Sequence, residues 1–398
     1  MQILYILCFF YAITIIRNIT LEQKIEYQKA LFSNRLKRKS KELKKWARKN
    51  RISCYRIYDR DIPEIPVSLD IYELLPDGIE TQIEAVRYLQ YIDEQISNNN
   101  PVIQSEIMQN TYAVLYLYER PYEKDEEEEN EWLMQMADAA AETLKIPSSH
   151  IVKKQRRRQR GVSQYEKNDD ANSSSFAIKG ITQEQNELFY VDLTSYLDTG
   201  LFFDHRPLRS VIRENARKKS VLNLFCYTGS FSVYAAQGGA SKVESVDLSN
   251  TYLNFAKKNM ELNGFSNSKN YVYTRQDCIE FLKERALAAK SGNLKPEDYY
   301  DIIILDPPTF SNSKNTYNVL DINKDWPQLV KDCLNILSPG GTLYFSTNST
   351  KLVFDRLKLP QATLSGKVIM SEDITFDSIP KDFEGTKCHK AWKFQIAK

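Results

Sequence analysis

From about residue 206 to its end, the chain alternates short apolar segments with longer amphipathic ones, and this alternation constrains the fold more than any other feature. Short apolar runs are typical of buried strands, and apolar residues at helical spacing are typical of helices between them. We expect strands at residues 221–227, 242–247, 270–275, 301–305, 342–347, 367–373 and 390–396, and helices at residues 207–219, 230–237, 251–263, 278–289 and 326–337. The pattern predicts an α/β fold, with a mostly parallel open sheet covered by helices on both faces.

The residues that follow each expected strand are the candidates for a binding site, because open parallel sheets bind ligands beyond the carboxyl ends of their strands. Tyr227, Thr228 and Gly229 end the first expected strand and begin the turn after it. The single glycine lets the backbone pass close beneath a ligand. The dinucleotide fingerprint G-x-G-x-x-G is absent, which argues against a dehydrogenase.

Three aspartates lie at the ends of the next three expected strands. Asp247 can accept hydrogen bonds from ribose hydroxyls, Asp277 can accept from an adenine amine beside Cys278, and Asp306 follows the fourth strand. One such aspartate is often only a helix N-cap. Three in register, together with the single-glycine turn, predict S-adenosylmethionine, whose nucleoside needs hydrogen-bond acceptors but no phosphate cradle.

Asp306 begins the segment Asp306-Pro307-Pro308-Thr309-Phe310, and two consecutive prolines make it rigid. Backbone carbonyls held in fixed directions can grip a planar nucleobase that stacks on Phe310. The alternative is that Phe310 packs in the core. The candidate catalytic residues are Asp306, Pro307, Pro308 and Phe310.

The cysteines constrain which atom of a base receives the methyl group. Methylation of pyrimidine C5 needs a cysteine nucleophile, and neither residues 306–309 nor residues 345–348 contain one. Cys333 is expected within a helix, and Cys226 lies in the first strand. A base nitrogen has its own lone pair and needs little beyond alignment, so the sequence favours a nitrogen target.

The N-terminal half is strongly basic between Arg35 and Arg60, where only Glu42 and Asp59 oppose twelve lysines and arginines. We expect a helix over residues 33–49, capped by Ser33, with an apolar stripe beneath a basic face. This face suits a phosphate backbone, although a merely solvated helix would look similar. In residues 151–160, an expected strand places four basic residues on one face, which suits either a polyanion or a charged strand edge: Lys154, Arg156, Arg158 and Arg160.

Residues 1–16 are apolar but shorter than the roughly 20 residues that cross a bilayer, and no basic residue precedes them. A membrane anchor is therefore not expected; a buried element of a neighbouring domain is the alternative. Six scattered cysteines and three distant histidines, His150, His205 and His389, indicate neither a disulfide framework nor a metal site. We expect a reduced, cytoplasmic protein without a metal, divided into an apolar segment (1–32), a basic α+β region (33–205) and a catalytic domain (206–398).

Three segments of the chain resemble a known family: residues 200–206 (GLFFDHR), 223–229 (NLFCYTG) and 306–314 (DPPTFSNSK). They are similar to the C-terminal half of the bacterial bifunctional 23S ribosomal RNA guanine methyltransferases, the RlmKL type, and residues 34–59 share the likeness. The resemblance implies a class I, Rossmann-like S-adenosylmethionine-dependent methyltransferase with a mostly parallel seven-stranded sheet and an N-terminal α+β RNA-binding region. It implies methylation of guanine N7 in 23S rRNA or a ribosomal precursor particle.

In that family the positions of Asp247, Asp277 and Asp306 serve the cofactor, and the segment ending in Arg206 lies beside the site. The candidate cofactor-binding residues are Arg206, Phe225, Tyr227, Thr228, Gly229, Asp247, Leu248, Asp277, Cys278 and Asp306. The THUMP domain and the N2-guanine half of the family have no counterpart in this sequence, so we expect the second activity to be absent. Two alternatives remain: a cytosine-C5 rRNA methyltransferase, and a non-catalytic ribosome-assembly factor, which the three intact aspartates disfavour. The sequence leaves the oligomeric state open.

Overall fold

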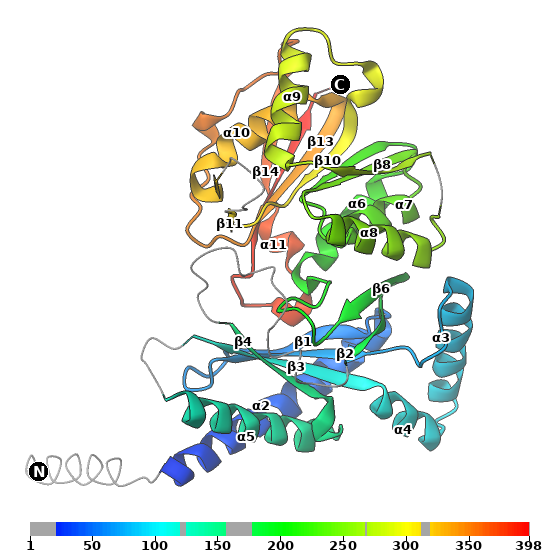
Figure 1. Ribbon diagram of the computed structural model, residues 1–398, viewed down its shortest axis with the longest axis vertical. Coiled ribbons are helices and arrows are strands. Elements are labelled where there is room, and N and C mark those ends of the chain that lie inside the picture. The colour runs from blue at the N-terminus through cyan, green and yellow to red at the C-terminus, as the bar shows by residue number, and fades with distance from the viewer. Residues whose placement is uncertain (1–20, 120–124, 157–176, 267–268, 312–318, 398) are drawn as a thin grey trace, which may run out of the picture.

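The computed structural model describes residues 21–119, 125–156, 177–266, 269–311 and 319–397. A four-stranded sheet lies at one end of the molecule and a seven-stranded sheet at the other, with a two-stranded hairpin between them (Figure 1). Within the described residues, no helix combines the length and the apolar character needed to cross a membrane.

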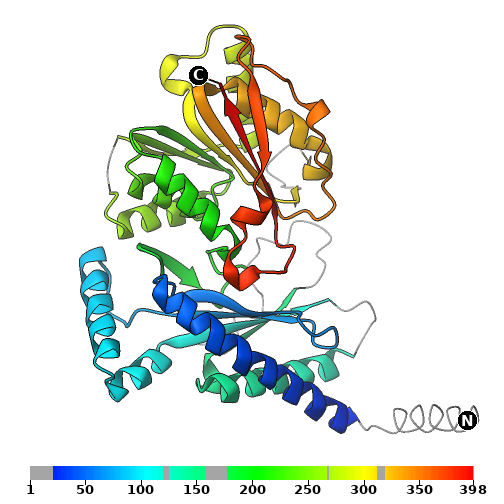
Figure 2. The same ribbon diagram turned by 180° about the vertical axis from the view of Figure 1, so that it is seen from behind.

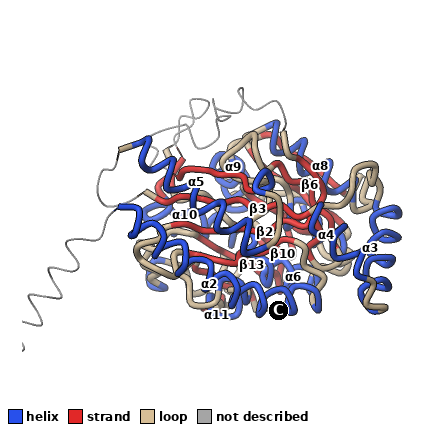
Figure 3. Tube along the Cα trace, turned by 90° about the horizontal axis from the view of Figure 1, so that it is seen from below, coloured by secondary structure: helices blue, strands red, loops and turns tan. Residues whose placement is uncertain are grey.

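The four-stranded sheet has the order β1-β2-β3-β4. The strands are β1 (Cys54–Asp59), β2 (Val67–Glu73), β3 (Thr111–Tyr118) and β4 (Ile151–Arg156), of which only β4 runs parallel to its neighbour. Helices α2 (Leu21–Lys49) and α5 (Glu126–Leu144) cover one face (Figures 2 and 3), and the helices α3 (Gln82–Ser97) and α4 (Pro101–Gln109), which connect β2 to β3, lie beyond one end of the strands (Figure 1). Trp132 of α5 is buried in the core beneath this face.

Helix α2 begins well before the expected cap, so the prediction that Ser33 is an N-cap is wrong. The reason is that the apolar stripe extends further back: Phe32 and Leu36 are both fully buried, and the Phe32 ring packs edge-on against Tyr58 with centroids 4.8 Å apart. The predicted stripe itself is confirmed by the burial of Leu43 and Ala47. The expected boundary after residue 32 therefore falls inside α2, and the apolar segment 1–16 lies outside the described residues.

The seven-stranded sheet has the order β14-β15-β13-β10-β7-β8-β9. Its strands are β7 (Ser220–Leu224), β8 (Lys242–Asp247), β9 (Tyr271–Arg275), β10 (Tyr300–Leu305), β13 (Leu337–Thr347), β14 (Ile369–Asp373) and β15 (Lys390–Ile396). The first five are parallel, whereas β15 is antiparallel to both β13 and β14. The predicted α/β, mostly parallel seven-stranded sheet is confirmed.

Helices cover both faces of this sheet (Figure 1). They are α6 (Arg206–Asn215), α7 (Ser230–Gln237) and α8 (Asn250–Leu262) on one face, and α9 (Cys278–Lys290) and α10 (Ile322–Asn335) on the other. The strand order reverses between β7 and β10, because β8 and β9 extend the sheet in one direction and β13 in the other. A ligand is expected at this switch point, beyond the carboxyl ends of β7 and β10.

The hairpin β5 (Lys179–Glu184) and β6 (Glu187–Asp192) joins the two sheets. On one side, the Ser53 amide donates to the Gln183 carbonyl at 2.9 Å, next to β1. On the other, the amide of Tyr190 in β6 donates to the Asn259 side chain of α8 at 3.0 Å. The hairpin thus fixes the orientation of the N-terminal sheet relative to the larger one.

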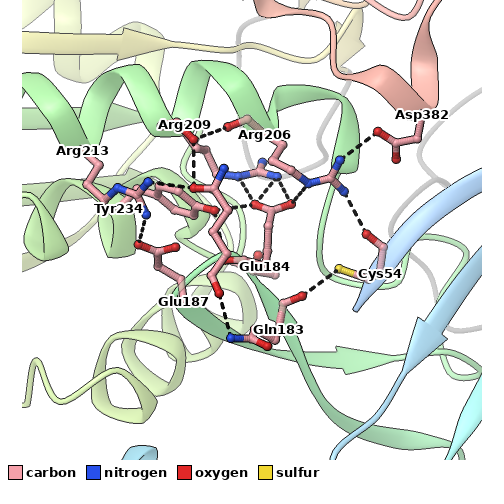
Figure 4. Close-up of polar contacts among 12 residues, drawn as sticks. Cys54, Gln183, Glu184, Glu187, Arg206, Arg209, Arg213, Tyr234 and Asp382 are labelled. Atoms are coloured by element: carbon pink, nitrogen blue, oxygen red, sulfur yellow. Dashed lines mark hydrogen bonds and ion pairs between the residues drawn. The ribbon is translucent and has the colours of Figure 1, made fainter. Parts of the chain in front are cut away.

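Buried ion pairs reinforce this joint (Figure 4). Glu184, fully buried at the end of β5, accepts from Arg206 Nε at 2.9 Å and from Arg209 Nε at 2.8 Å, both on α6. Arg206 also donates to Asp382 at 2.8 Å and to the Cys54 carbonyl of β1 at 2.9 Å. One guanidinium therefore ties together the hairpin, the first sheet and the C-terminal segment that contains Asp382.

Replacing Glu184 by Gln is expected to lower the free energy of unfolding by about 3 kcal/mol, because it leaves the buried Arg209 without a carboxylate. Chemical denaturation followed by fluorescence measures this change. The matched control is Glu26→Gln, which removes a surface ion pair between Glu26 and Lys29; we expect it to change stability by less than about 1 kcal/mol. Equal effects of the two substitutions would contradict the role given to Glu184.

Candidate active site

The turn after β7 takes an unusual backbone conformation. Phe225, Tyr227 and Gly229 all have positive φ angles, of 53°, 51° and 75°. The strand therefore ends at Leu224, earlier than expected, because residues with positive φ cannot continue it. Left-handed conformations cost non-glycine residues about 1–2 kcal/mol each, and such strain is typical of functional sites.

Gly229 is required for packing as well as for its φ angle. A Cβ atom placed there would lie 2.6 Å from the Cβ of Ala256 in α8. The turn can approach α8 only because residue 229 has no side chain. We expected the glycine to allow a close approach to a ligand, and the structure shows that it allows a close approach to a helix.

Asp247, the last residue of β8, holds the same turn in place. Its Oδ2 accepts from the Tyr227 amide at 3.0 Å, and its Oδ1 accepts from the Ser249 amide at 2.8 Å. Burial raises the pKa of Asp247 to about 6, although the backbone hydrogen bonds from Ser249 and Tyr227 oppose this rise. Leu248, the next residue, has its carbonyl 3.4 Å from Arg275 Nε at the end of β9.

Asp277 and Cys278 begin α9, next to the same turn. Asp277 caps the helix, with its Oδ1 accepting from the Ile279 amide at 2.7 Å. The Cys278 Sγ accepts from the Phe225 amide at 3.1 Å and lies 3.5 Å from the Val246 carbonyl. Burial is the main cause that raises the pKa of Cys278 well above its usual value, so its side chain is a neutral thiol that links two strand ends.

A pocket lies beside this turn and contains residues that the sequence did not indicate. Tyr227 and Thr228 line it together with Gly200, Tyr252 and Phe255. The Thr228 hydroxyl donates to the Gly200 carbonyl at 2.6 Å, which joins the turn to the segment after β6. Tyr252 packs edge-on against Tyr227, with ring centroids 4.6 Å apart. Tyr252 could have been predicted as a pocket residue from its position in the first turn of the helix that follows Asp247.

Asp306 follows β10 directly and is held at both of its oxygens. Ser346 donates to Oδ1 at 2.6 Å, and His205 Nε2 lies 3.3 Å from Oδ2. Neither partner was expected, because Ser346 and His205 are far from Asp306 in sequence and only the parallel pairing of β10 with β13 brings Ser346 close.

The residues after Asp306 present an aromatic ring to solvent. The alternative in which Phe310 packs in the core is wrong, because the side chain is 51% exposed. Thr309 donates its hydroxyl to the side-chain oxygen of Asn348, which follows β13. Pro307 and Pro308 lie between these anchored residues, and the end of the DPPTFSNSK motif, residues 312–314, lies outside the described part of the chain.

Arg206 does not lie with the other candidates. Its side chain is 2% exposed and binds Glu184, Asp382 and the Cys54 carbonyl in the network of Figure 4. The guanidinium is therefore part of the joint between the sheets, and we remove it from the cofactor set. The preceding residue, His205, is the one that reaches Asp306.

Replacing Gly229 by Ala is expected to lower the free energy of unfolding by about 2 kcal/mol more than replacing Gly292 by Ala. Both glycines have similar φ angles, 75° and 73°, but a Cβ at Gly292 would meet nothing within 4 Å. The difference isolates the contact with α8 from the backbone strain. Thermal and chemical denaturation of the two variants measure it, and equal destabilisation would show that packing at Gly229 is unimportant.

Comparison with known proteins identifies the family. A model of the S-adenosylmethionine-dependent methyltransferase family matches residues 103–375. Among solved structures, the methyltransferase SMU.776, complexed with SAH, superposes with a TM-score of 0.59 at 19% identity, covering 92% of this chain and 82% of that chain. A Streptococcus mutans SAM-dependent methyltransferase gives the same TM-score and identity over 81% of its chain. These two likenesses concern the fold.

Curated relatives are more similar in sequence. The ribosomal RNA large subunit methyltransferase K/L of Cellvibrio japonicus is 38% identical over 361 residues, which is 90% of this chain and 41% of that protein. The chain thus spans about two fifths of the length of this relative. The ribosomal RNA large subunit methyltransferase K of Neisseria meningitidis serogroup B is 38% identical over 364 residues, 92% of this chain and 86% of that protein. The chain therefore belongs to the S-adenosylmethionine-dependent methyltransferases, in the K-type family of ribosomal RNA large subunit methyltransferases.

Proposed function

We propose that this protein transfers a methyl group from S-adenosylmethionine to N7 of a guanine in 23S rRNA. The relatives of K type are named as methyltransferases of large-subunit ribosomal RNA. The observation that supports a nitrogen target most directly is the turn after β10, where a fixed carboxylate and an exposed aromatic ring adjoin and no cysteine lies in Asp306–Phe310 or Phe345–Asn348. A ribosomal substrate places the protein in the cytoplasm.

A cytosine-C5 reaction is disfavoured by the state of the cysteines. Cys226 and Cys278, the two that lie at the strand ends, are buried. Burial is the main cause that raises the pKa of each thiol well above its usual value. A C5 reaction needs an accessible thiolate, and neither side chain supplies one.

We place the cofactor across the carboxyl ends of β7, β8 and β9. The Asp247 carboxylate would accept from the ribose hydroxyls, in addition to the amides that it already binds, and Asp277 with Cys278 would lie against the adenine. Gly229 and the positive φ angles of Phe225 and Tyr227 keep the turn beneath the cofactor compact. The pocket beside Tyr227 and Thr228 continues from this turn and would receive part of the bound molecule.

For this reaction, the protein needs only to align guanine N7 with the methyl carbon and to stabilise the positive charge that develops on the purine. The guanine N7 lone pair forms a bond to the methyl carbon while the bond from carbon to sulfur breaks and its electrons remain on sulfur. No proton moves, and the positive charge passes from the sulfonium to the purine. A carboxylate fixed at Asp306 would stabilise that charge, while Phe310 stacks on the base.

The exposed basic face of α2 is the proposed RNA-binding surface (Figure 2). Lysines and arginines on this face point to solvent, namely Lys37, Arg38, Lys41, Lys45, Arg48 and Lys49. Some of the other basic residues in this region are paired with acids; Arg35, for example, binds Asp61 at 3.2 Å. We assign RNA binding to the region before residue 206 and methyl transfer to the remainder.

Two of the four residues of the second basic patch, Lys154 and Arg156, lie in the described part of the chain, and neither is free to bind a polyanion. Lys154 is buried and donates to the carbonyls of Tyr196 and Leu197 at 2.6 and 3.1 Å. Arg156 binds Asp198 at 3.2 Å and lies over the Tyr116 ring. Both cations therefore form their contacts within the protein. Arg158 and Arg160 lie outside the described residues.

The proposed function is tested by incubating the purified protein with methyl-labelled S-adenosylmethionine and 23S rRNA from cells that lack its gene. We expect label on guanine, in 7-methylguanosine located by chemical cleavage at that nucleotide and by mass mapping. Label on cytosine C5 would favour the first alternative. Binding of RNA without binding of the cofactor, measured by calorimetry, would favour the non-catalytic assembly factor.

Cofactor affinity is expected to depend on the ionisation of Asp247. Hydrogen bonds from ribose hydroxyls favour the ionised carboxylate, and the pKa of Asp247 is raised to about 6 by burial. The dissociation constant for S-adenosylmethionine should be constant above about pH 7 and should rise about tenfold for each pH unit below the pKa. Isothermal titration calorimetry measures it.

The matched control is Asp247→Asn, which has no ionisable group at this position. It should bind the cofactor weakly at every pH, without the step near the pKa of Asp247. A wild-type affinity that stays flat through this range would remove Asp247 from the ribose site.

A further inference from the structure

Two histidines that the sequence places far apart meet beside the proposed methyl-transfer site. His205, at the end of the short helix Phe203–His205, and His389, which precedes β15, stack with ring centroids 4.5 Å apart at 16°. His205 lies next to Asp306, and both rings are buried. The proposed mechanism assigns no role to either histidine.

The hydrogen bonds of His389 define its charge. Ser378 gives its only hydroxyl hydrogen to the Thr375 carbonyl at 2.9 Å, so it accepts from His389 Nε2 at 2.8 Å. The other ring nitrogen, Nδ1, donates to Asp204 Oδ2 at 3.0 Å. With a proton on both nitrogens, His389 is an imidazolium paired with Asp204. Burial disfavours this cation, but the hydrogen bonds to Asp204 and Cys388 outweigh it and raise the pKa of His389 to about 10.

The neighbours of His205 keep that ring neutral. Burial is the largest cause that lowers its pKa, and the charges of His389 and Arg209 lower it further, while those of Asp306 and Asp204 raise it. These are the charged groups that face the ring, from its own short helix, from α6, from the turn after β10 and from the segment before β15. The ring of Phe231 in α7 packs on it as well, 5.8 Å between centroids.

The position of the single proton on a neutral His205 follows from its surroundings. Nε2 faces two carboxylate oxygens, Asp306 Oδ2 at 3.3 Å and Asp204 Oδ2 at 3.8 Å. Nδ1 is buried and has no hydrogen-bond partner among the described residues. A hydrogen on Nδ1 would be an unsatisfied buried donor, and a bare Nε2 would place its lone pair against two anions. The proton therefore lies on Nε2.

We propose that His205 is a positioning residue for methyl transfer: its neutral ring, stacked on the His389 imidazolium, directs its Nε2–H at Asp306, 3.3 Å from Oδ2, and orients that carboxylate beside the reacting base. The inference deepens the proposed function and rests on it for the role of Asp306. Ser346 donates to the other carboxylate oxygen, so a polar side chain lies beside each oxygen of Asp306. His205 itself does not contact the reacting atoms.

The proposal has a consequence for the dependence of the rate on pH. Protonation of His205 places a hydrogen on the unpartnered Nδ1 and sets a second cation against His389. Both changes disfavour the present position of the ring, and a shift of the ring would move Nε2 away from Asp306. Because the pKa of His205 is lowered, the rate constant at saturating cofactor should fall only below pH 6.5, the ordinary pKa of histidine. Saturation separates this effect from the pH dependence of cofactor binding.

Three variants test the proposal through kcat and KM. His205→Phe keeps a planar ring but removes the donor, and we expect kcat to fall about 10- to 100-fold, as for the loss of a hydrogen bond to a charged group. His205→Gln places an amide N–H near the position of Nε2 and should therefore retain most of the wild-type kcat. Because glutamine does not titrate, the kcat of this variant should not fall at acidic pH. KM for RNA and the cofactor dissociation constant should change less than about threefold in both. The matched control is His150→Gln, which removes a ring stacked on Tyr112 in the first sheet.

A measurement on the wild-type protein is independent of activity and of variant folding. The sequence has only three histidines, so their ring nitrogens can be resolved by 15N NMR, with each signal assigned by its absence from the corresponding variant. At neutral pH we expect His389 doubly protonated and His205 protonated on Nε2 alone. An Nδ1-protonated or cationic His205 would overturn the proposal, as would equal kcat losses in His205→Phe and His205→Gln or an unchanged kcat in His205→Phe.

The outcomes also separate this inference from the proposed function. If the methyl group is mapped to another nucleotide or atom while NMR shows the expected tautomer, guanine N7 is the wrong target. The kcat comparison is then repeated on the atom that is modified, and it decides the role of His205. If 7-methylguanosine forms but the tautomer is wrong, His205 alone loses its role.

Discussion

The arrangement of the whole molecule depends on one buried carboxylate, Glu184, placed between two guanidinium groups. Arg206 and Arg209 lie one turn apart on α6, and both bind Glu184 at the end of the connecting hairpin. Arg206 continues to Asp382 and to the backbone of β1. Buried charges are costly unless they are paired and fully hydrogen-bonded, so this network permits one relative orientation of the two sheets. The basic face of α2 is thereby held in a fixed position relative to the strand ends.

The strand ends themselves are joined by short polar contacts within the chain. Asp247 connects β8 to the turn after β7, and Cys278 connects α9 to the same turn. Each contact uses a backbone amide that a strained turn would otherwise leave unpaired. These contacts hold the turn in place, and in the proposed cofactor site such order lowers the cost of binding.

Asp306, the carboxylate at the proposed methyl-transfer position, has partners that come from distant segments of the chain. Ser346 comes from β13 and His205 from the segment before α6, and His205 in turn is stacked on His389, which precedes the strand β15. The ion pair of His389 with Asp204 stays inside the protein, so its charge acts on His205 rather than on the substrate. This arrangement of charges holds His205 in one protonation state.

Much of this organisation is determined by the sequence alone. The β/α alternation defined the fold, and the strand Lys242–Asp247 was predicted to the residue. The same logic placed Asp247, Asp277 and Asp306 at neighbouring strand ends. Local signals failed where tertiary packing extended an element, as at the start of α2, or where positive φ angles ended one, as at Phe225.

Only the tertiary structure decided which charged side chains are free to bind a ligand and which are paired within the protein. Nothing in the sequence distinguishes three basic residues, Arg206, Lys154 and Arg156, from the others. In the structure, each forms a hydrogen bond with a partner at least 22 residues away in the chain. The pairing of His205 with His389 and Asp306 likewise joins segments that no local pattern connects. Periodicity reports which face of an element is buried, but the partner that a buried charge meets is set by the packing of distant elements, and that information appears only when the chain is folded.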